Sequence, residues 1–336
     1  MNALDSWLNK TQEEAIEPEL PICDPHHHLW DYEGSRYLLD QLLADIGGGH
    51  NVRSTVFVEC SSMYRKDGPA AMRPVGETEF VQGIAAMSAS GGYGECRVAA
   101  GIVGFADLTL GAAVDDVLEA HLIAGHGRFR GIRHACSWHD SDEIRNSHTN
   151  PPPGLLMDAS FRQGVARLEK YDLSFEAWLY HTQLEELLDL ARALPGTSII
   201  LNHVGGPLGI GPHRGRQSEI FDGWARNIEA LAGCPNIVVK LGGIAMPLNG
   251  FDWHKRDQPP SSKELATSQA PYYLHCIEHF GAERAMFESN FPVDRRSTSY
   301  TVLWNGFKRI AAGGSEAEKA ALFHDTAARI YRIGSA

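Results

Sequence analysis

Residues 24–31 read DPHHHLWD and directly follow PIC, the first short apolar run of the chain. Side chains in a strand point alternately to its two faces, so Asp24, His26 and His28 are predicted to share one side of an extended segment. Two imidazoles spaced in this way can bind one divalent cation through nitrogen and leave other coordination positions for more distant residues and a water molecule. The stretch therefore predicts a polar site at the end of a first strand.

Seven more short apolar runs follow, and the segments between them have apolar residues recurring every three or four positions. This alternation is typical of repeated βα units around a parallel sheet. We expect strands at 21–26, 54–59, 97–104, 129–135, 173–179, 197–204, 236–242 and 285–290. We expect helices at 77–90, 111–124, 160–171, 182–194 and 216–232. Eight units fit a closed α/β barrel, a single (β/α)8 TIM barrel, better than an open sheet.

The 336 residues suffice for one barrel or for two medium-sized domains, and no linker or change of composition divides them. We therefore expect a single domain over 1–336, in which 1–20 form a polar N-terminal extension. Two long irregular stretches, 137–154 and 246–262, follow the fourth and seventh predicted strands. In a barrel such βα loops lie over the C-terminal face, so they are predicted to wall the site. The alternative is an ordered surface loop without chemistry.

The formal net charge is −12 and the basic residues are dispersed, which disfavours nucleic acid as a partner. The N-terminus has no apolar signal segment, and no uncharged apolar stretch is long enough to cross a bilayer, so we expect a cytoplasmic protein without a membrane partner. Six scattered cysteines without a CxxC pair are expected to be reduced thiols. A homo-oligomer is left open.

A third histidine, His203, ends the sixth predicted strand before a Gly-Gly-Pro turn, where its ring should reach the same barrel mouth; a core histidine bonded to backbone is the alternative. Glu59 ends the second strand, and Glu288 and Asn290 occupy same-facing positions of the eighth. In a closed barrel both strands flank the first. One carboxylate could orient an imidazole or a water while another accepts a proton, although Glu59 could equally be a structural acid paired with arginine.

Positive and polar groups at other strand ends are candidate substrate contacts. Arg133 ends the fourth strand, and its planar guanidinium suits a substrate carboxylate, with a structural ion pair as the alternative. The further candidates for substrate binding are His134, Lys240, Trp138, Trp178 and Tyr180. These residues predict a small and anionic substrate.

Five motifs in order along the chain, DPHHHLWD, RGIRH, LNHVGGP, VKLGG and MFESNFPVD, resemble those of the amidohydrolase-2 family. The resemblance is to the branch that includes sugar-lactone lactonases and the 2-pyrone-4,6-dicarboxylate and sulfomuconolactone hydrolases. It implies a barrel in which His26, His28 and His203 ligate zinc or another divalent ion, or bind the substrate carbonyl directly as in metal-independent relatives. It also implies an enzyme that opens a lactone ring.

The chain departs from the family pattern at the position of the water-activating aspartate, which is Asn290 here and cannot accept a proton. The neighbouring glycine of the pattern is replaced by Glu288, which we expect to supply the missing carboxylate and take over proton transfer. The alternative is that Glu288 is a buried structural acid hydrogen-bonded to arginine or Lys240, with Glu59 or Asp294 handling the proton. The predicted function is hydrolysis of a lactone or related cyclic ester of a small organic or sugar acid. The alternatives are non-oxidative decarboxylation on the same barrel, and a binding protein that has lost its base.

Overall fold

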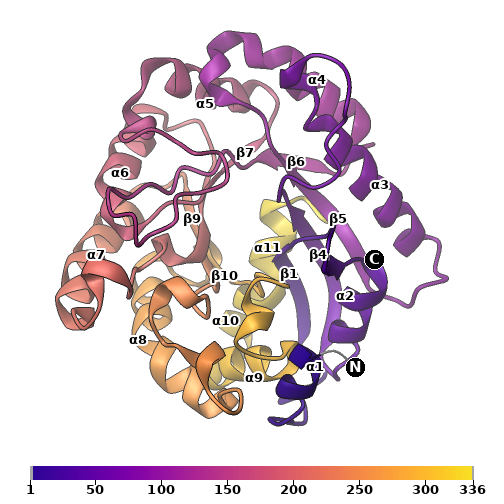
Figure 1. Cartoon of the computed structure of the whole chain (residues 1–336), viewed down its shortest axis with the longest axis vertical. Coiled ribbons are helices and arrows are strands. Elements are labelled where there is room, and N and C mark those ends of the chain that lie inside the picture. Colours follow the sequence, from indigo (N-terminus) through magenta and orange to yellow (C-terminus); the bar gives the residue numbers. More distant parts are fainter. Residues whose placement is uncertain (1–2, 335–336) are drawn as a thin grey trace.

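The chain forms a closed barrel of eight parallel strands in the computed structural model, which describes residues 3–334 (Figure 1). The outermost residues of the expected domain and extension, 1–2 and 335–336, lie outside this range. The strands pair in chain order: β1 (Pro21–His27), β4 (Asn51–Val58), β5 (Arg97–Gly104), β6 (Phe129–Ile132), β7 (Ser174–Ala177), β8 (Ile199–Leu201), β9 (Ile237–Leu241) and β10 (Ala285–Phe287). The predicted (β/α)8 fold is confirmed.

Closure of the barrel occurs just beyond β10. The backbone N–H of Asn290 donates to the carbonyl of His26 at 2.9 Å, and that of His28 donates to the carbonyl of Phe291 at 2.7 Å. These bonds join the last motif of the sequence directly to the first. The residues singled out in both motifs therefore lie side by side at one mouth of the barrel.

Helices form the outer ring around the strands, as Figure 1 shows, and their apolar faces make one core with the outward side chains of the barrel. The five helices expected from periodicity are present as α3, α4, α5, α6 and α7, with ends shifted by a few residues. The helices are α1 (Ala3–Leu8), α2 (Leu39–Ile46), α3 (Val75–Ala89), α4 (Asp115–Ala124), α5 (Ala159–Lys170), α6 (Leu184–Ala193), α7 (Gln217–Ala232), α8 (Ser262–Phe280), α9 (Tyr300–Ile310), α10 (Glu316–Ala320) and α11 (Thr326–Ile330). A small antiparallel hairpin, β2 (Trp30–Tyr32) and β3 (Ser35–Tyr37), follows β1.

The barrel interior is filled by the end of the chain. Ala327 and Tyr331 are buried in one cluster with inward side chains of six strands, among them Cys23, Val56 and Met286. Figure 1 shows α11 lying beside β1 and β10 inside the ring of helices. This segment closes the end of the barrel opposite the histidines, so the interior is a packed core.

The alternation expected along the first strand is interrupted. The pairing of β1 with β4 shifts register between Asp24 and His27, and such a bulge changes which side chains face inward. Asp24 accepts a hydrogen bond of 2.9 Å from the hydroxyl of Tyr300 on α9, an outer helix. The expectation that Asp24 shares a face with His26 and His28 is therefore wrong.

Part of the expected N-terminal extension packs on the loop before α8. The indole of Trp7, the ammonium of Lys10 and the hydroxyl of Thr11 each donate to a backbone carbonyl of that loop, at 2.8 Å in all three cases. Among the helices of residues 3–334, none is both long enough and apolar enough to cross a bilayer.

Candidate active site

Three histidines from distant parts of the chain meet at the C-terminal mouth of the barrel. The ring centroid of His26 lies 5.0 Å from that of His28 and 4.6 Å from that of His203. All three side chains are buried. His203 lies just beyond Leu201, the last residue of β8, in a left-handed turn with φ of 53°. The rings lie together as the strand ends suggested.

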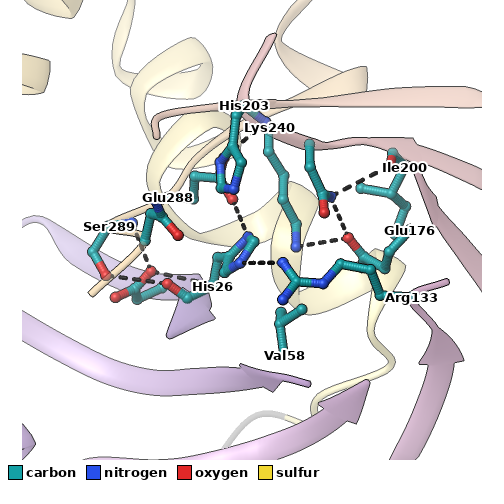
Figure 2. A network of polar contacts seen from close by, with 12 residues as sticks. His26, Val58, Arg133, Glu176, Ile200, His203, Lys240, Glu288 and Ser289 are labelled. Atoms are coloured by element: carbon teal, nitrogen blue, oxygen red, sulfur yellow. Dashed lines mark hydrogen bonds and ion pairs between the residues drawn. The ribbon is translucent and has the colours of Figure 1, made fainter. Parts of the chain in front are cut away.

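The carboxylate of Glu288 lies behind two of these rings (Figure 2). Its Oε1 is 2.6 Å from Nδ1 of His203, and its Oε2 is 2.6 Å from Nδ1 of His26. The backbone N–H of His203 also donates to Oε1 at 3.1 Å. Gly243 of the VKLGG motif makes room for this pair, because a Cβ there would lie 2.0 Å from Nδ1 of His203. The carboxylate thus accepts hydrogen bonds from His203, whereas its Oε2 and Nδ1 of His26 are in close contact but have no hydrogen-bond partner among the described residues.

These contacts assign the protons on the rings. An ionised carboxylate only accepts, so Nδ1 of His203 carries hydrogen and its Nε2 keeps a free lone pair. In His28, Nδ1 is 2.7 Å from the carbonyl of Val58 and donates to it, which leaves Nε2 as an acceptor in the same way. His203 and His28 therefore offer lone pairs at the mouth, whereas Nε2 of His26 accepts from Arg133 at 3.2 Å.

Arg133 extends this network to the rim of the site. Its Nε donates to Oε1 of Glu59 at 2.8 Å, and Oε2 of Glu59 lies 3.1 Å from Nε2 of His148. Glu59 is fully buried, whereas the side chain of His148 is 33% exposed. A continuous chain of charged and polar groups thus runs from Glu288 through His26, Arg133 and Glu59 to the loop after β6.

Burial and local charge keep the deep imidazoles neutral. Burial lowers the pKa of His26 well below its ordinary value, and the positive charge of Lys240 acts in the same direction. Burial and Arg133 likewise lower the pKa of His28. Burial alone would raise the pKa of Glu59, but Arg133 and His148 lower it to about 2. The rings are therefore hydrogen-bonding groups and proton acceptors, beside a fixed carboxylate.

A cavity of about 480 Å³ opens in front of these groups, and its walls include six of the residues predicted from the sequence. Those six are His28, Arg133, Trp178, Tyr180, His203 and Asn290. The other predicted residues do not line it. His26, Glu59 and Glu288 lie behind the lining residues and are bonded to them.

His134, Trp138 and Lys240, expected as substrate contacts, lie away from the cavity. Nδ1 of His134 accepts a hydrogen bond of 3.2 Å from the backbone of Leu108, and its ring packs against Phe161. The backbone N–H of Trp138 is bonded to Gln183 at 3.0 Å. β6 ends at Ile132, so His134 and Trp138 lie in the loop that follows it.

Lys240 belongs to a layer beneath the histidines. Its ammonium is 2.9 Å from Oε2 of Glu176, and both side chains are fully buried. The same carboxylate accepts hydrogen bonds from Asn202, at 2.5 Å, and from the hydroxyl of Tyr331. Through the bond from Tyr331, this ion pair is linked to the C-terminal segment that closes the barrel, and Figure 2 shows the contact between Lys240 and Glu176.

Asn290 stands at the cavity wall with its amide fixed from behind. Its Nδ2 donates to Oδ1 of Asp294 at 3.0 Å. Burial raises the pKa of Asp294 well above its ordinary value. An amide has two N–H donors, so the second one is available to a group in the cavity.

Residues of the loop after β6 are part of the site that the sequence did not single out. His148, Arg145 and Ile144 line the cavity, as does Arg296 from the segment after β10. The stretch 137–154 was recognisable as a βα loop, but an irregular loop has no periodicity that says which side chains point inward. Its individual members could not be selected.

The residue types around Glu288 suit a divalent metal, but their arrangement does not. His26, His203 and Glu288 place ligand atoms within 4.8 Å of one another. The contacts of 2.6 Å on either side of the carboxylate are shorter than the separation of about 3.3 Å between two ligands that each lie about 2.05 Å from a tetrahedral zinc. Nε2 of His26 faces the guanidinium of Arg133, itself a cation.

A hydrogen-bonded histidine and carboxylate cluster at the C-terminal mouth of a parallel barrel defines an enzyme site. Residues 23–333 match the family model described as amidohydrolase. The chain therefore belongs to the amidohydrolase family and is an enzyme of the hydrolase class. This confirms the family and the enzyme class predicted from the five motifs.

Individual relatives agree with this assignment. The chain is 34% identical over 329 residues to the uncharacterised protein y4mH of Sinorhizobium fredii, covering 94% of this chain and 99% of that protein. It is 25% identical over 326 residues to L-fucono-1,5-lactonase of Burkholderia multivorans, covering 92% and 95%. A crystal structure of an amidohydrolase from Burkholderia multivorans with bound zinc has the same fold, with TM-score 0.70, 23% identity and coverage of 93% and 99%.

Proposed function

We propose that this protein hydrolyses a lactone or related cyclic ester of a small organic acid by direct attack of water. The observation that carries the proposal is the pairing of Glu288 with His203, whose free ring nitrogen faces the cavity. The relatives named as lactonases support the substrate class. The hydrolytic water requires a base, and the geometry supplies one without the aspartate of the family pattern.

His203 is the proposed general base. Glu288 fixes the tautomer that leaves Nε2 free and stabilises the imidazolium that forms when this nitrogen takes a proton. His28 provides a second lone pair beside it and can hold the attacking water. Glu288 therefore acts on the water through His203, which replaces the direct proton transfer expected from the sequence.

Donors for the carbonyl oxygen come from the opposite wall. Arg133 lines the cavity, and three of its five N–H groups are bonded to Glu59 and His26, which leaves two. Asn290 offers the second N–H of its amide. Donors fixed in advance at the position where negative charge develops account for much of the rate of acyl transfer. An aspartate at position 290 could not donate in this way when ionised.

The proposed step conserves protons. The oxygen of water bonds to the carbonyl carbon while His203 removes one proton, and the negative charge moves to the carbonyl oxygen facing Arg133 and Asn290. The carbonyl then reforms, the ring C–O bond breaks, and the proton on His203 passes to the leaving alkoxide. The product is a hydroxy acid.

The proposal includes a metal-independent site. The predicted set of His26, His28 and His203, with a divalent ion such as zinc, is the alternative, and it would require one nitrogen of His26 to be free of its present neighbour, Arg133 or Glu288. The zinc named for the related structure belongs to that protein.

A panel assay tests the proposed function. The purified protein is mixed with aldonolactones, aromatic lactones and aromatic carboxylic acids, and acid release and carbon dioxide are measured separately. Ring opening releases acid, decarboxylation releases carbon dioxide, and a binding protein releases neither. Acid release that is lost in His203→Asn supports the proposal, and carbon dioxide release, or the absence of any turnover on the panel, contradicts it.

A further inference from the structure

One wall of the active-site cavity is apolar. It is formed by Ile144, Trp178, Tyr180, Ile210 and Leu248, which belong to a small hydrophobic cluster separate from the main core. They come from the loops after β6, β7, β8 and β9. Apolar surface in contact with water is unfavourable. A contiguous apolar wall inside a reaction cavity therefore indicates a ligand that covers it.

Trp178 brings this wall up to the proposed base. Its ring lies edge-on to that of His203, with centroids 4.8 Å apart. The indole fits because residue 206 is a glycine with φ of 53°, where a Cβ would come within 3.0 Å of the ring and 2.5 Å of the carbonyl of Leu179. The part of a substrate beside the reacting carbonyl therefore meets an aromatic surface.

Three polar side chains of the cavity on the loops after β6 and β7 are bonded to backbone groups. Ser147 is bonded to backbone carbonyls at 3.2 and 3.3 Å, Asn146 accepts from the backbone of His139 at 2.7 Å, and the hydroxyl of Tyr180 donates to the carbonyl of Arg145. A sugar lactone carries several hydroxyl groups, each of which loses water on binding and needs a partner. These three side chains already have partners, so this part of the cavity suits an apolar group better than hydroxyl groups.

Two guanidinium groups at the rim are exceptions. Arg145 and Arg296 line the cavity, and neither forms an ion pair or a side-chain hydrogen bond with any residue in the described range 3–334. Glu143 lines the same rim and is the opposing charge. Arg133 is held by Glu59 and His26. The cations available to an anionic substrate are therefore at positions 145 and 296.

From this division of the cavity we infer that the substrate is a cyclic ester with an apolar body, aromatic or alkyl, that also bears a carboxylate. The body covers the wall around Trp178, the ester carbonyl reaches His203, and the carboxylate meets Arg145 and Arg296. Hydrolysis of such a compound adds one water, breaks the ring C–O bond and gives a hydroxy-dicarboxylate. The inference rests on the proposed hydrolase function and departs from a polyhydroxylated sugar lactone.

Binding of stable probes tests the inference without turnover. The probes are 3-phenylpropanoate, gluconate and 3-phenylpropanol, which separate the apolar body from the charge, and binding to the full chain is measured by calorimetry. We expect 3-phenylpropanoate to bind at least about tenfold more tightly than either of the others. Trp178→Ala should weaken both aromatic probes. Arg145→Gln and Arg296→Gln, singly and together, should weaken only the anionic one.

Arg53→Gln is the matched control, because Arg53 lies near the start of β4, at the far end of the barrel. Gluconate binding as tightly as 3-phenylpropanoate, or unchanged affinity in the double arginine variant, would overturn the inference. Hydrolysis of sugar lactones by a protein that does not bind 3-phenylpropanoate would overturn it while the proposed function stands. If the probes bind as expected but no lactone is hydrolysed, the inferred ligand class is supported and the proposed function is rejected.

Discussion

Oε1 of Glu288 accepts two hydrogen bonds from His203, one from Nδ1 of the ring at 2.6 Å and one from the backbone N–H at 3.1 Å. The two residues follow β10 and β8, 85 positions apart in the chain. The double contact fixes both the position and the tautomer of the imidazole. Glu288 itself does not reach the cavity, so its effect on chemistry passes through the ring.

Glu288→Gln is expected to lower kcat by about 10² or more with the fold intact, because a neutral amide neither fixes the Nδ1–H tautomer nor stabilises the imidazolium. His203→Asn should cost at least as much. If the two act as one unit, the double variant should be no slower than His203→Asn alone. Steady-state kinetics on the best lactone measures this cycle. Additive losses of kcat in the double variant would show that Glu288 transfers protons independently. Near-normal turnover in Glu288→Gln would show that Glu288 does not orient His203 for catalysis.

Arg133→Met is expected to destabilise the protein by about 3–5 kcal/mol, because it leaves the fully buried carboxylate of Glu59 without its cation. Urea unfolding at pH 7 measures the change. Replacing both partners in Arg133→Met/Glu59→Leu should recover part of the loss, since no uncompensated charge then stays buried. If the single variant is stable and its only defect is a raised KM for carboxylated substrates, Arg133 binds the substrate carboxylate, as the sequence suggested.

The barrel was predictable because its information is local and repeated. Each βα unit carries an apolar run and an amphipathic helix, and the closing bonds between His26 and Asn290 follow from eight such units. The ends of strands were less predictable. The expected strand 129–135 extends three residues beyond Ile132, where β6 ends, because residues after the strand, such as Ala135, are also buried. The bulge after Asp24 has no signature in the alternation.

The sequence predicted which residues belong to the site better than it predicted what each of them does. Glu288 stood out because it replaces a glycine of the family pattern, but its position behind two histidines depends on how deep it lies in the barrel. Arg133 stood out as a charge in an apolar strand, yet its partner Glu59 is 74 positions away. Such pairing is set by the register of neighbouring strands, which a single sequence does not state.

Metal removal tests the arrangement around His26. We expect protein treated with EDTA and then dialysed to keep its activity, with well under one equivalent of zinc, manganese or iron by elemental analysis. The physical reason is that Nε2 of His26 already faces Arg133, and that Nδ1 of His26 lies only 2.6 Å from Oε2 of Glu288, closer than two ligands of one zinc ion. Untreated protein handled identically is the control. Loss of activity on chelation that is restored by one equivalent of Zn²⁺ would establish the metal-bound alternative.

A pH-dependent contribution to stability is expected from the contact of α4 with α5. Hydrogen bonds from Arg167, at 2.8 Å, and Lys170, at 3.0 Å, hold the pKa of Asp115 well below its ordinary value. A lowered native pKa stabilises the fold above the unfolded pKa of about 3.9, and this stability is lost as pH falls below it. Asp115→Asn should cost up to about 1 kcal/mol at pH 7, since the pair is largely solvated, and less at pH 3. Urea unfolding at both pH values measures this loss of stability.

Asp116→Asn, at the exposed neighbouring position, is the control. An equal loss of stability for Asp115→Asn at both pH values would contradict the assignment of a lowered pKa to Asp115.

Asn290→Asp restores the residue of the family pattern and is expected to lower activity. The new carboxyl would face Asp294, which accepts from Nδ2 of Asn290 at 3.0 Å, and the pair would share a proton or repel. It would also remove the amide donor proposed for the carbonyl oxygen, and loss of one such donor costs roughly 10²–10³ in kcat. Asn290→Ala removes the donor without adding charge and is the matched comparison. If donation is the role of Asn290, both variants should lose kcat with KM little changed. A gain in kcat for Asn290→Asp, with an acid limb appearing in its pH profile, would show that a carboxylate at this position reaches the water and that His203 is not the base.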